Sequence, residues 1–298
     1  MEIGVISSSE GYSNEELRDL KKAISKSGAE YININLSESF VRIEKGAVAV
    51  MHTDGGKAER ITPEAAVMRS IGIIRDYEQF SHRLWLAQAM ELNGMTISNK
   101  ISSWVSASDK LGTLVILSKH KIPVPDTTSS ENFFHGYAAV RKYADTVIKP
   151  LRSGKGIGVF RISDPDAAMH IFSYFTNLSK PIYVQRFLEK KGSGDFRVVV
   201  VNGEVIGAEF RKAKSWKSNV AQGAEPRKAH INAEMREIAI KATGALKLDY
   251  AGIDIADTKD GYYVLEANPT ISWSGFRRVT GVNPALYIIK NLISKARN

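Results

Sequence analysis

Two strand-like segments near the carboxyl-terminal end of the chain constrain its fold most strongly. Residues 251–255 and 262–268 are mainly apolar, and a short turn separates them. Because side chains alternate along a strand, Glu266 and Asn268 point to the same side. Pairing of the two strands would bring Asp254 beside them, so the sequence predicts a hairpin that gathers three oxygen-bearing side chains.

Those three side chains have the chemistry of a magnesium site. Carboxylate and amide oxygens are hard ligands, and they suit Mg²⁺ best when substrate phosphates complete its coordination shell. A polar, solvated face of an edge hairpin would give the same pattern. The hairpin alone does not decide between these interpretations.

The composition is that of an ordinary globular protein. The chain has 298 residues, 43% of them hydrophobic and 24% charged, which is enough for a large core and two or three lobes. It has no cysteine, which excludes disulfides and thiolate metal sites and is compatible with a reducing cytoplasm. The start of the chain lacks a signal-peptide pattern, and no apolar run approaches the roughly 20 residues that span a bilayer. We therefore expect a cytoplasmic protein without a membrane partner.

The net charge of +9 indicates acidic partners. The positive residues recur through the second half of the chain and do not form a tail. Either a nucleic-acid-binding protein or an enzyme acting on polyanions such as ATP would have this composition. No nucleic-acid motif accompanies the charge, so we favour the enzyme.

The pattern of helices and strands changes along the chain. The first third alternates strands with helices, including a helix that begins at a capping box of Ser13 and Glu16, and this favours a parallel α/β sheet. The middle third begins near residue 99, and Ser108 is expected to cap a helix there. The last third is rich in hairpins, the clearest of which turns at Asn202 and Gly203.

A glycine-rich segment between two predicted strands can hold phosphate groups. Lys149 ends the first strand, and Gly154, Gly156 and Gly158 allow the backbone N–H groups to approach an anion. The segment is not a P-loop, since no Ser or Thr follows Lys155 and a strand comes next. The alternative is a flexible hairpin tip.

Other candidate groups are less specific. Residues 183–188 form an apolar strand that would suit an adenine pocket or an ordinary core, and Arg211 would suit a transferring phosphoryl group or a solvated surface. The six histidines show no metal-ligand spacing, and the chain has no Gly-x-Ser-x-Gly motif. Hydrolase chemistry based on a His-assisted serine is therefore disfavoured.

The order of these elements resembles that of the ATP-grasp superfamily, and within it the RimK-like amino-acid (alpha-L-glutamate) ligases of archaeal type. The resemblance covers roughly residues 65–290. It rests on these residues in this order: Asp109, Lys110, Lys149, Gln185, Arg186, Phe187, Leu188, Asp195, Phe196, Arg197, Arg211, Asn219, Asp254, Glu266 and Asn268.

The resemblance implies a three-lobed ATP-grasp fold that combines α/β and α+β elements. An N-terminal α/β pre-ATP-grasp domain would span residues 1–98. A central lobe with the glycine-rich loop would span residues 99–184, and a C-terminal lobe with the metal site would span residues 185–298. ATP would lie between the last two lobes.

The resemblance also implies roles for individual residues. Asp254, Glu266 and Asn268 would hold one or two Mg²⁺ or Mn²⁺ ions. Arg211 and Asn219 would act catalytically around the γ-phosphate and the acyl intermediate. The residues that would bind ATP are Lys110, Lys149, Ser153, Gly154, Gly156, Gly158, Gln185, Arg186, Phe187, Leu188 and Asp195.

An acceptor site is expected beyond the metal ligands. Trp273, Phe276 and Arg277 follow Asn268 closely, and Arg69 matches an N-terminal arginine of the family. An aromatic acceptor would stack on Trp273 or Phe276. The alternative is that these rings pack in the core. The chain departs from the family pattern at Lys217, where members often carry arginine.

These implications combine into one expected function. The enzyme would use ATP to turn a carboxylate into an acyl phosphate, which an amine then attacks. It would join an amino acid, L-glutamate, to an acidic acceptor such as a pterin or deazaflavin cofactor. The alternatives are a protein acceptor, namely a ribosomal-protein tail or a carrier protein of lysine or arginine biosynthesis, and a non-catalytic nucleotide- or nucleic-acid-binding module. A homo-oligomer is compatible with the sequence.

Overall fold

The computed structural model describes residues 1–8, 14–54, 56–72, 76–151, 158–213, 215–217 and 223–297. Its N-terminal domain contains a four-stranded sheet in the order β2-β1-β6-β7, in which every pair is parallel. This confirms the expected α/β arrangement. Its elements are β1 (Glu2–Ser7), α1 (Asn14–Lys26), β2 (Glu30–Asn35), β6 (Ala65–Met68), α2 (Tyr77–Leu92) and β7 (Thr96–Ser98).

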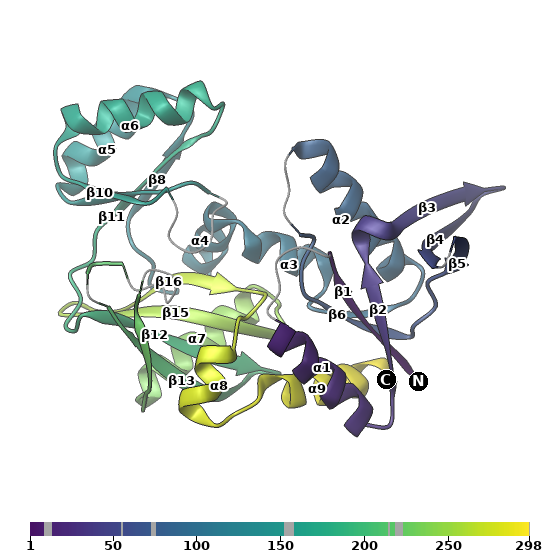
Figure 1. The fold of residues 1–298 in the computed structure, drawn as a ribbon. Helices are drawn as coiled ribbons and strands as arrows, with labels where there is room; N and C mark the ends of the chain where they lie inside the picture. The colour runs from purple at the N-terminus through teal and green to yellow at the C-terminus, as the bar shows by residue number, and fades with distance from the viewer. Residues whose placement is uncertain are drawn as a thin grey trace.

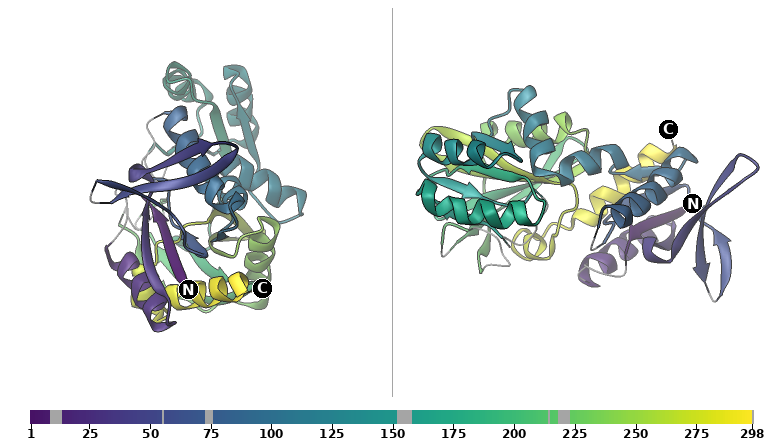
Figure 2. Two further views of the ribbon diagram at one scale, coloured as in Figure 1. Left: turned by 90° about the vertical axis from the view of Figure 1, so that its right-hand side faces the viewer. Right: turned by 90° about the horizontal axis from the view of Figure 1, so that it is seen from above.

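A small antiparallel sheet projects from this domain, away from the remainder of the molecule (Figures 1 and 2). It comes after η1 (Leu36–Glu38) and consists of β3 (Ser39–Glu44), β4 (Ala47–Asp54) and β5 (Lys57–Arg60).

Two helices connect the N-terminal domain to the central lobe, namely α3 (Ile101–Ser108) and α4 (Lys110–Lys119). The prediction that Ser108 caps a helix was wrong, because Ser108 ends α3. Asp109 caps α4 instead, and its side chain accepts a hydrogen bond from the Gly112 backbone at 2.8 Å. Buried side chains of this region, including Leu117, belong to the core beneath the C-terminal sheet.

The central lobe is an antiparallel sheet in the order β10-β9-β11-β8, with α5 and α6 packed against it (Figure 1). Asp164 caps α6, and Pro165 occupies its first position, where proline is tolerated. The expected boundary between residues 184 and 185 falls inside β11. The elements are β8 (Thr127–Ser130), α5 (Phe133–Tyr143), β9 (Thr146–Ile148), β10 (Phe160–Ile162), α6 (Pro165–Asn177) and β11 (Ile182–Arg186).

The C-terminal lobe carries a five-stranded antiparallel sheet in the order β14-β13-β12-β15-β16. Asn202 and Gly203 form the expected turn between β12 and β13. One face of the sheet is apolar and packs on α7. The elements are β12 (Gly194–Val201), β13 (Glu204–Lys212), β14 (Glu225–Lys228), α7 (Ala233–Ala245), β15 (Tyr250–Thr258) and β16 (Gly261–Asn268).

The last two helices return to the N-terminal domain. They are α8 (Ser274–Thr280) and α9 (Pro284–Arg297), and α9 lies beside α1, β6 and β7. One core cluster therefore joins side chains from both ends of the chain, such as Ile3 and Leu20 with Trp273 and Ile288. Both termini lie at this side of the molecule (Figure 1). Within the described residues, no helix combines the length and the apolar character needed to cross a membrane.

Candidate active site

A row of charged side chains crosses the five-stranded sheet on the face opposite α7. The strand register places Lys228, Glu209, Arg197, Asp254 and Glu266 directly opposite one another, one from each strand. Paired residues of an antiparallel sheet point to the same face. The hairpin therefore brings Asp254 beside Glu266, as the sequence predicted.

Asp254 is the most strongly bound carboxylate of this row. Arg197 binds it with two contacts, from Nε to Oδ1 at 2.8 Å and from Nη2 to Oδ2 at 2.9 Å. The Nη2 atom of Arg211 adds a third contact to Oδ2 at 2.8 Å. Burial alone would raise the pKa of Asp254, but the two guanidinium groups lower it below its ordinary value. Asp254 is therefore ionised at neutral pH.

Arg211 connects two of the residues that the sequence singled out. Besides Asp254 it binds Asp195, from Nε to Oδ1 at 2.8 Å. Lys190 lies 3.7 Å from the other oxygen of Asp195. Burial would lower the pKa of Arg211, yet the two carboxylates raise it, so the guanidinium stays charged. The structure thus gathers Asp195, Arg211 and Asp254 into one buried network.

The donor set beside this network fits a hard divalent cation. Asp254 and Glu266 are like charges on neighbouring strands; Arg197 and Arg211 pair with Asp254, and Glu266 adds a second carboxylate beside it that a cation would also favour. Asn268 donates its amide hydrogens to the Gly252 carbonyl at 3.3 Å and to Asp254 at 3.4 Å, which turns its own oxygen towards other partners. In the part of the chain described, no cluster of three or more His, Cys, Asp or Glu side chains is placed to hold a metal. A cation here would therefore also need amide and phosphate oxygens.

Two lysines lie near this site. Lys149 donates a hydrogen bond from Nζ to Gln185 Oε1 at 2.9 Å, and its ammonium lies 5.4 Å from the centre of the Tyr183 ring. Burial lowers the pKa of Lys149 to about 8, Glu266 opposes that shift, and Lys110 adds to it. The Nζ of Lys110 reaches the carbonyl of Leu151 at 3.3 Å, where the glycine-rich segment begins.

The end of β11 connects the central and C-terminal lobes. Arg186 binds Asp126 at 2.9 Å, and the backbone N–H of Phe187 donates to the Asp145 carbonyl at 2.8 Å. Leu188, next along, is buried. An open cavity of about 530 Å³ lies beside this connection. Its lining includes Asp145, Arg161, Phe187, Lys190, Gly194 and Trp216.

Four predicted site residues lie outside the described part of the chain, namely Ser153, Gly154, Gly156 and Asn219. Gly158 is described and has φ +70°, a conformation that only glycine adopts without strain. This positive φ explains why glycine ends the segment.

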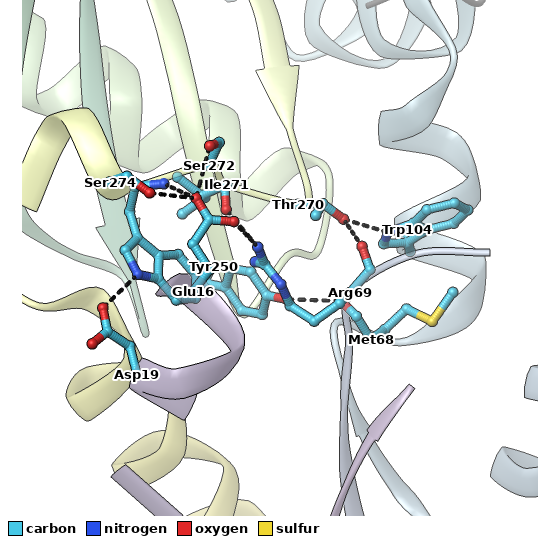
Figure 3. A network of polar contacts seen from close by, with 11 residues as sticks. Glu16, Asp19, Met68, Arg69, Trp104, Tyr250, Thr270, Ile271, Ser272 and Ser274 are labelled. Atoms are coloured by element: carbon cyan, nitrogen blue, oxygen red, sulfur yellow. Dashed lines mark hydrogen bonds and ion pairs between the residues drawn. The ribbon is translucent and has the colours of Figure 1, made fainter. Parts of the chain in front are cut away.

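The predicted acceptor residues lie mainly in the core. Trp273 and Phe276 are 0% and 1% exposed, which leaves neither ring a face on which an acceptor could stack. Trp273 donates from Nε1 to Asp19 at 3.2 Å, and Arg277 pairs with the same carboxylate. Arg69 is buried against Glu16 (Figure 3). Trp273 and Phe276 therefore pack in the core, which was the alternative that the sequence left open for them. Arg69 is buried in the same region.

The sequence assigned no role to Lys228, Arg197 or Glu209, three residues of the row. Arg197 and Glu209 each stand two positions from an assigned residue on the same strand, so alternation along the strand would have found both. Among the described atoms, the buried Oε2 of Glu209 has no hydrogen-bond partner. Burial raises the pKa of Glu209, while Arg197 and Arg211 oppose that shift.

Comparison with known proteins places this geometry in a family. The model of the RimK-like ATP-grasp domain matches residues 107–292. The chain is 30% identical over 302 residues to the tetrahydromethanopterin:alpha-L-glutamate ligase of Methanococcus maripaludis, an alignment that covers 100% of this chain and 98% of that protein. It is 30% identical over 216 residues to the coenzyme gamma-F420-2:alpha-L-glutamate ligase of Methanocaldococcus jannaschii, covering 70% of this chain and 74% of that protein.

Solved structures confirm the ATP-grasp fold over the whole chain. A RimK domain ATP-grasp protein from Sphaerobacter thermophilus superposes with a TM-score of 0.74 at 21% identity, covering 98% of this chain and 100% of that one. The ATP-grasp ligase PsnB, in complex with a minimal precursor, Mg and ADP, superposes with a TM-score of 0.73 at 18% identity, covering 99% and 98%.

Proposed function

The chain belongs to the RimK-like ATP-grasp family and is a ligase that forms amide bonds, and from this premise we propose that it joins L-glutamate to a small acidic acceptor. The observation that carries the proposal is the end-to-end similarity to a tetrahydromethanopterin:alpha-L-glutamate ligase. Membership of a ligase family disfavours the non-catalytic binding module.

The proposed reaction has two steps. A carboxylate oxygen of the acceptor attacks the γ-phosphorus of ATP, which forms an acyl phosphate and releases ADP. The amine of glutamate then attacks the acyl carbon, loses a proton, and displaces inorganic phosphate. Mg²⁺ would neutralise the phosphate charge that develops in the first step. No protein nucleophile is needed in either step.

The residues of the site suit this sequence of steps. Asp254, Glu266 and Asn268 would supply the oxygen ligands for the cation at the β15–β16 end of the sheet. Lys149 and Lys110 supply positive charge for the phosphates from the side of the central lobe. Arg211, already between two carboxylates, would neutralise the transferring group. The cavity beside Phe187 offers room for the nucleoside.

A cofactor-like acceptor is favoured over a protein acceptor. The two archaeal relatives act on tetrahydromethanopterin or coenzyme F420, according to their names, and both align at 30% identity. The structure of PsnB with a bound precursor aligns at 18% identity, which supports only a shared fold. The net charge of +9 suits an acidic acceptor of either kind.

The test is ADP release from Mg²⁺ and ATP with L-glutamate, in the presence of tetrahydromethanopterin or coenzyme F420, followed by product mass. We expect ADP release that requires both substrates, and a product heavier than the acceptor by one or more glutamyl residues. The Glu266→Gln variant is the matched control and should release no ADP above background. ADP release that instead requires a protein acceptor would contradict the proposed acceptor, and release with another amino acid would contradict glutamate.

A further inference from the structure

The segment directly after Asn268 is held by residues from the first 104 positions of the chain, and Figure 3 shows these contacts from Thr270 to Ser274. Each residue from 269 to 274 makes a hydrogen bond with a residue between 16 and 104. The N-terminal partners are Glu16, Asp19, Arg69, Asn99 and Trp104. The segment that follows β16 is therefore held by residues that precede it by more than 160 positions.

Glu16 is the centre of these contacts. Its Oε1 accepts hydrogen bonds from Ser272 Oγ at 2.7 Å and from the Trp273 backbone at 2.8 Å. Its Oε2 accepts from Arg69 Nη2 at 3.0 Å, and the same nitrogen donates to the Ile271 carbonyl at 2.9 Å. Glu16 is 3% exposed and Arg69 is 1% exposed. One buried ion pair thus fixes three consecutive residues of the segment.

β15, the strand that carries Asp254, contacts the same part of the N-terminal domain. The hydroxyl of Tyr250, at the start of β15, donates to the Met68 carbonyl at 2.9 Å. Arg69, the next residue, lies over the Trp273 ring at 4.4 Å from its centre. The start of β15 and the segment after β16 therefore both contact residues 68 and 69 of the N-terminal domain.

We propose that Glu16 is a positioning residue for the ligase reaction: through the segment 269–274 it fixes the end of β16, and so the placement of Asn268 and Glu266 around the metal ion. The proposal rests on the proposed metal site. It gives the N-terminal domain a part in catalysis although Glu16 touches none of the metal ligands. Residues that orient metal ligands from behind commonly alter metal affinity by about 10-fold to 100-fold when they are removed.

The test measures metal binding directly, by electron paramagnetic resonance of free Mn²⁺ titrated with protein and ADP. We expect Glu16→Gln to weaken Mn²⁺ binding about 10-fold and to lower kcat, because the ion pair with Arg69 is lost. Ser272→Ala, which removes only one hydroxyl, should shift both in the same direction by less. Glu15→Gln is the matched control: Glu15 is exposed on the same helix and should leave both values at the wild-type level.

A purely structural role for Glu16 would give a different result. Glu16→Gln would then lower the melting temperature while the folded fraction bound Mn²⁺ as tightly as the wild type, and that result would overturn the proposal. If Glu16→Gln does not fold, unchanged Mn²⁺ binding by Ser272→Ala overturns it. Failure of the proposed function is distinguishable, because wild-type protein would then bind Mn²⁺ with ADP yet release no ADP from ATP with L-glutamate and either acceptor.

Discussion

Two regions of this molecule bury charged side chains, and they balance those charges differently. On the face of the five-stranded sheet opposite α7, Arg197 and Arg211 pair with Asp254, and Glu266 places a further negative charge directly opposite Asp254. At the contact with the N-terminal domain, Glu16 is paired with Arg69 among several hydrogen bonds. The added carboxylate in the first region favours a cation from outside the chain, whereas the matched charges of Glu16 and Arg69 hold the chain to itself. On the proposed function the first region is a ligand site, and the second is a scaffold.

The largest expected effect belongs to the scaffold. Trp273→Ala should lower the free energy of unfolding by about 3–5 kcal/mol, because it removes a fully buried ring from the core shared by the two ends of the chain. Chemical denaturation measures this loss. Trp85→Ala is the control, since Trp85 is 59% exposed on α2 and its loss should change stability little.

A different outcome for Trp273 would remove the distinction between the two regions. Wild-type stability combined with a raised KM for the acceptor would return Trp273 to acceptor binding. If the folded fraction of Trp273→Ala has the same KM for the acceptor as the wild type, Trp273 acts in the scaffold.

A smaller loss in free energy, but a more specific one, is expected at the ligand site. Glu266→Gln should reduce ADP formation by about 100-fold, which corresponds to about 3 kcal/mol of transition-state stabilisation. The fold should remain, because the substitution is isosteric and removes repulsion from Asp254. Steady-state kinetics and circular dichroism together measure both effects. Near-normal turnover by the folded variant would remove Glu266 from the metal site.

Asp254→Asn refines the contrast between the two regions. Asp254 has both an expected metal role and contacts with Arg197 and Arg211. Its loss removes the bidentate carboxylate partner of Arg197 and one of the two carboxylate partners of Arg211, which keeps Asp195. We expect this variant to lose activity and, unlike Glu266→Gln, to lose several kcal/mol of stability, on the order of 3. Equal stability of the two variants in denaturant titrations would show that the arginine contacts contribute little to folding.

The smallest expected effect is a pH dependence that arises from Lys149. Burial lowers the pKa of this ammonium from 10.5 to about 8, with Glu266 opposing the shift. The charge is therefore lost as the pH rises through about 8, and kcat/KM for ATP should fall above that pH, approaching 10-fold per pH unit. Protein stability should instead rise with pH between the two pKa values, because there the unfolded chain binds more protons than the folded one.

Lys149→Met provides the control for that pH profile. It removes the ammonium, so kcat/KM for ATP should be low at every pH and should no longer fall above pH 8. If the variant keeps the wild-type profile, another group titrates and Lys149 is not the one that contacts the phosphates.

The ligand site was more predictable from the sequence than the scaffold was. The two mainly apolar segments at 251–255 and 262–268 and the short turn between them predicted the hairpin, and the hairpin register is set by that turn. The turn at Asn202 and Gly203 was also a local signal. Each of these features depends on residues that are close in the sequence.

The scaffold depends on contacts between distant residues. Glu16 and Ser272 are 256 positions apart, and no local pattern in either segment predicts that the two are in contact. Trp273 could therefore be interpreted from the sequence only by its nearness to Asn268, which suggested an acceptor site. Asp109 was missed as a cap because Ser108 offered the same chemistry one residue earlier.

The proposed binding of the catalytic cation beside Asp254 and Glu266 can be tested by crystallography. Crystals grown with ADP and Mn²⁺ would locate the metal by its anomalous scattering. We expect a peak within about 2.5 Å of oxygens from Asp254 or Glu266, with the oxygen of Asn268 and the ADP phosphates completing the shell. A peak elsewhere in the ADP complex, with Asp254 and Glu266 still facing each other and free of metal, would contradict this assignment.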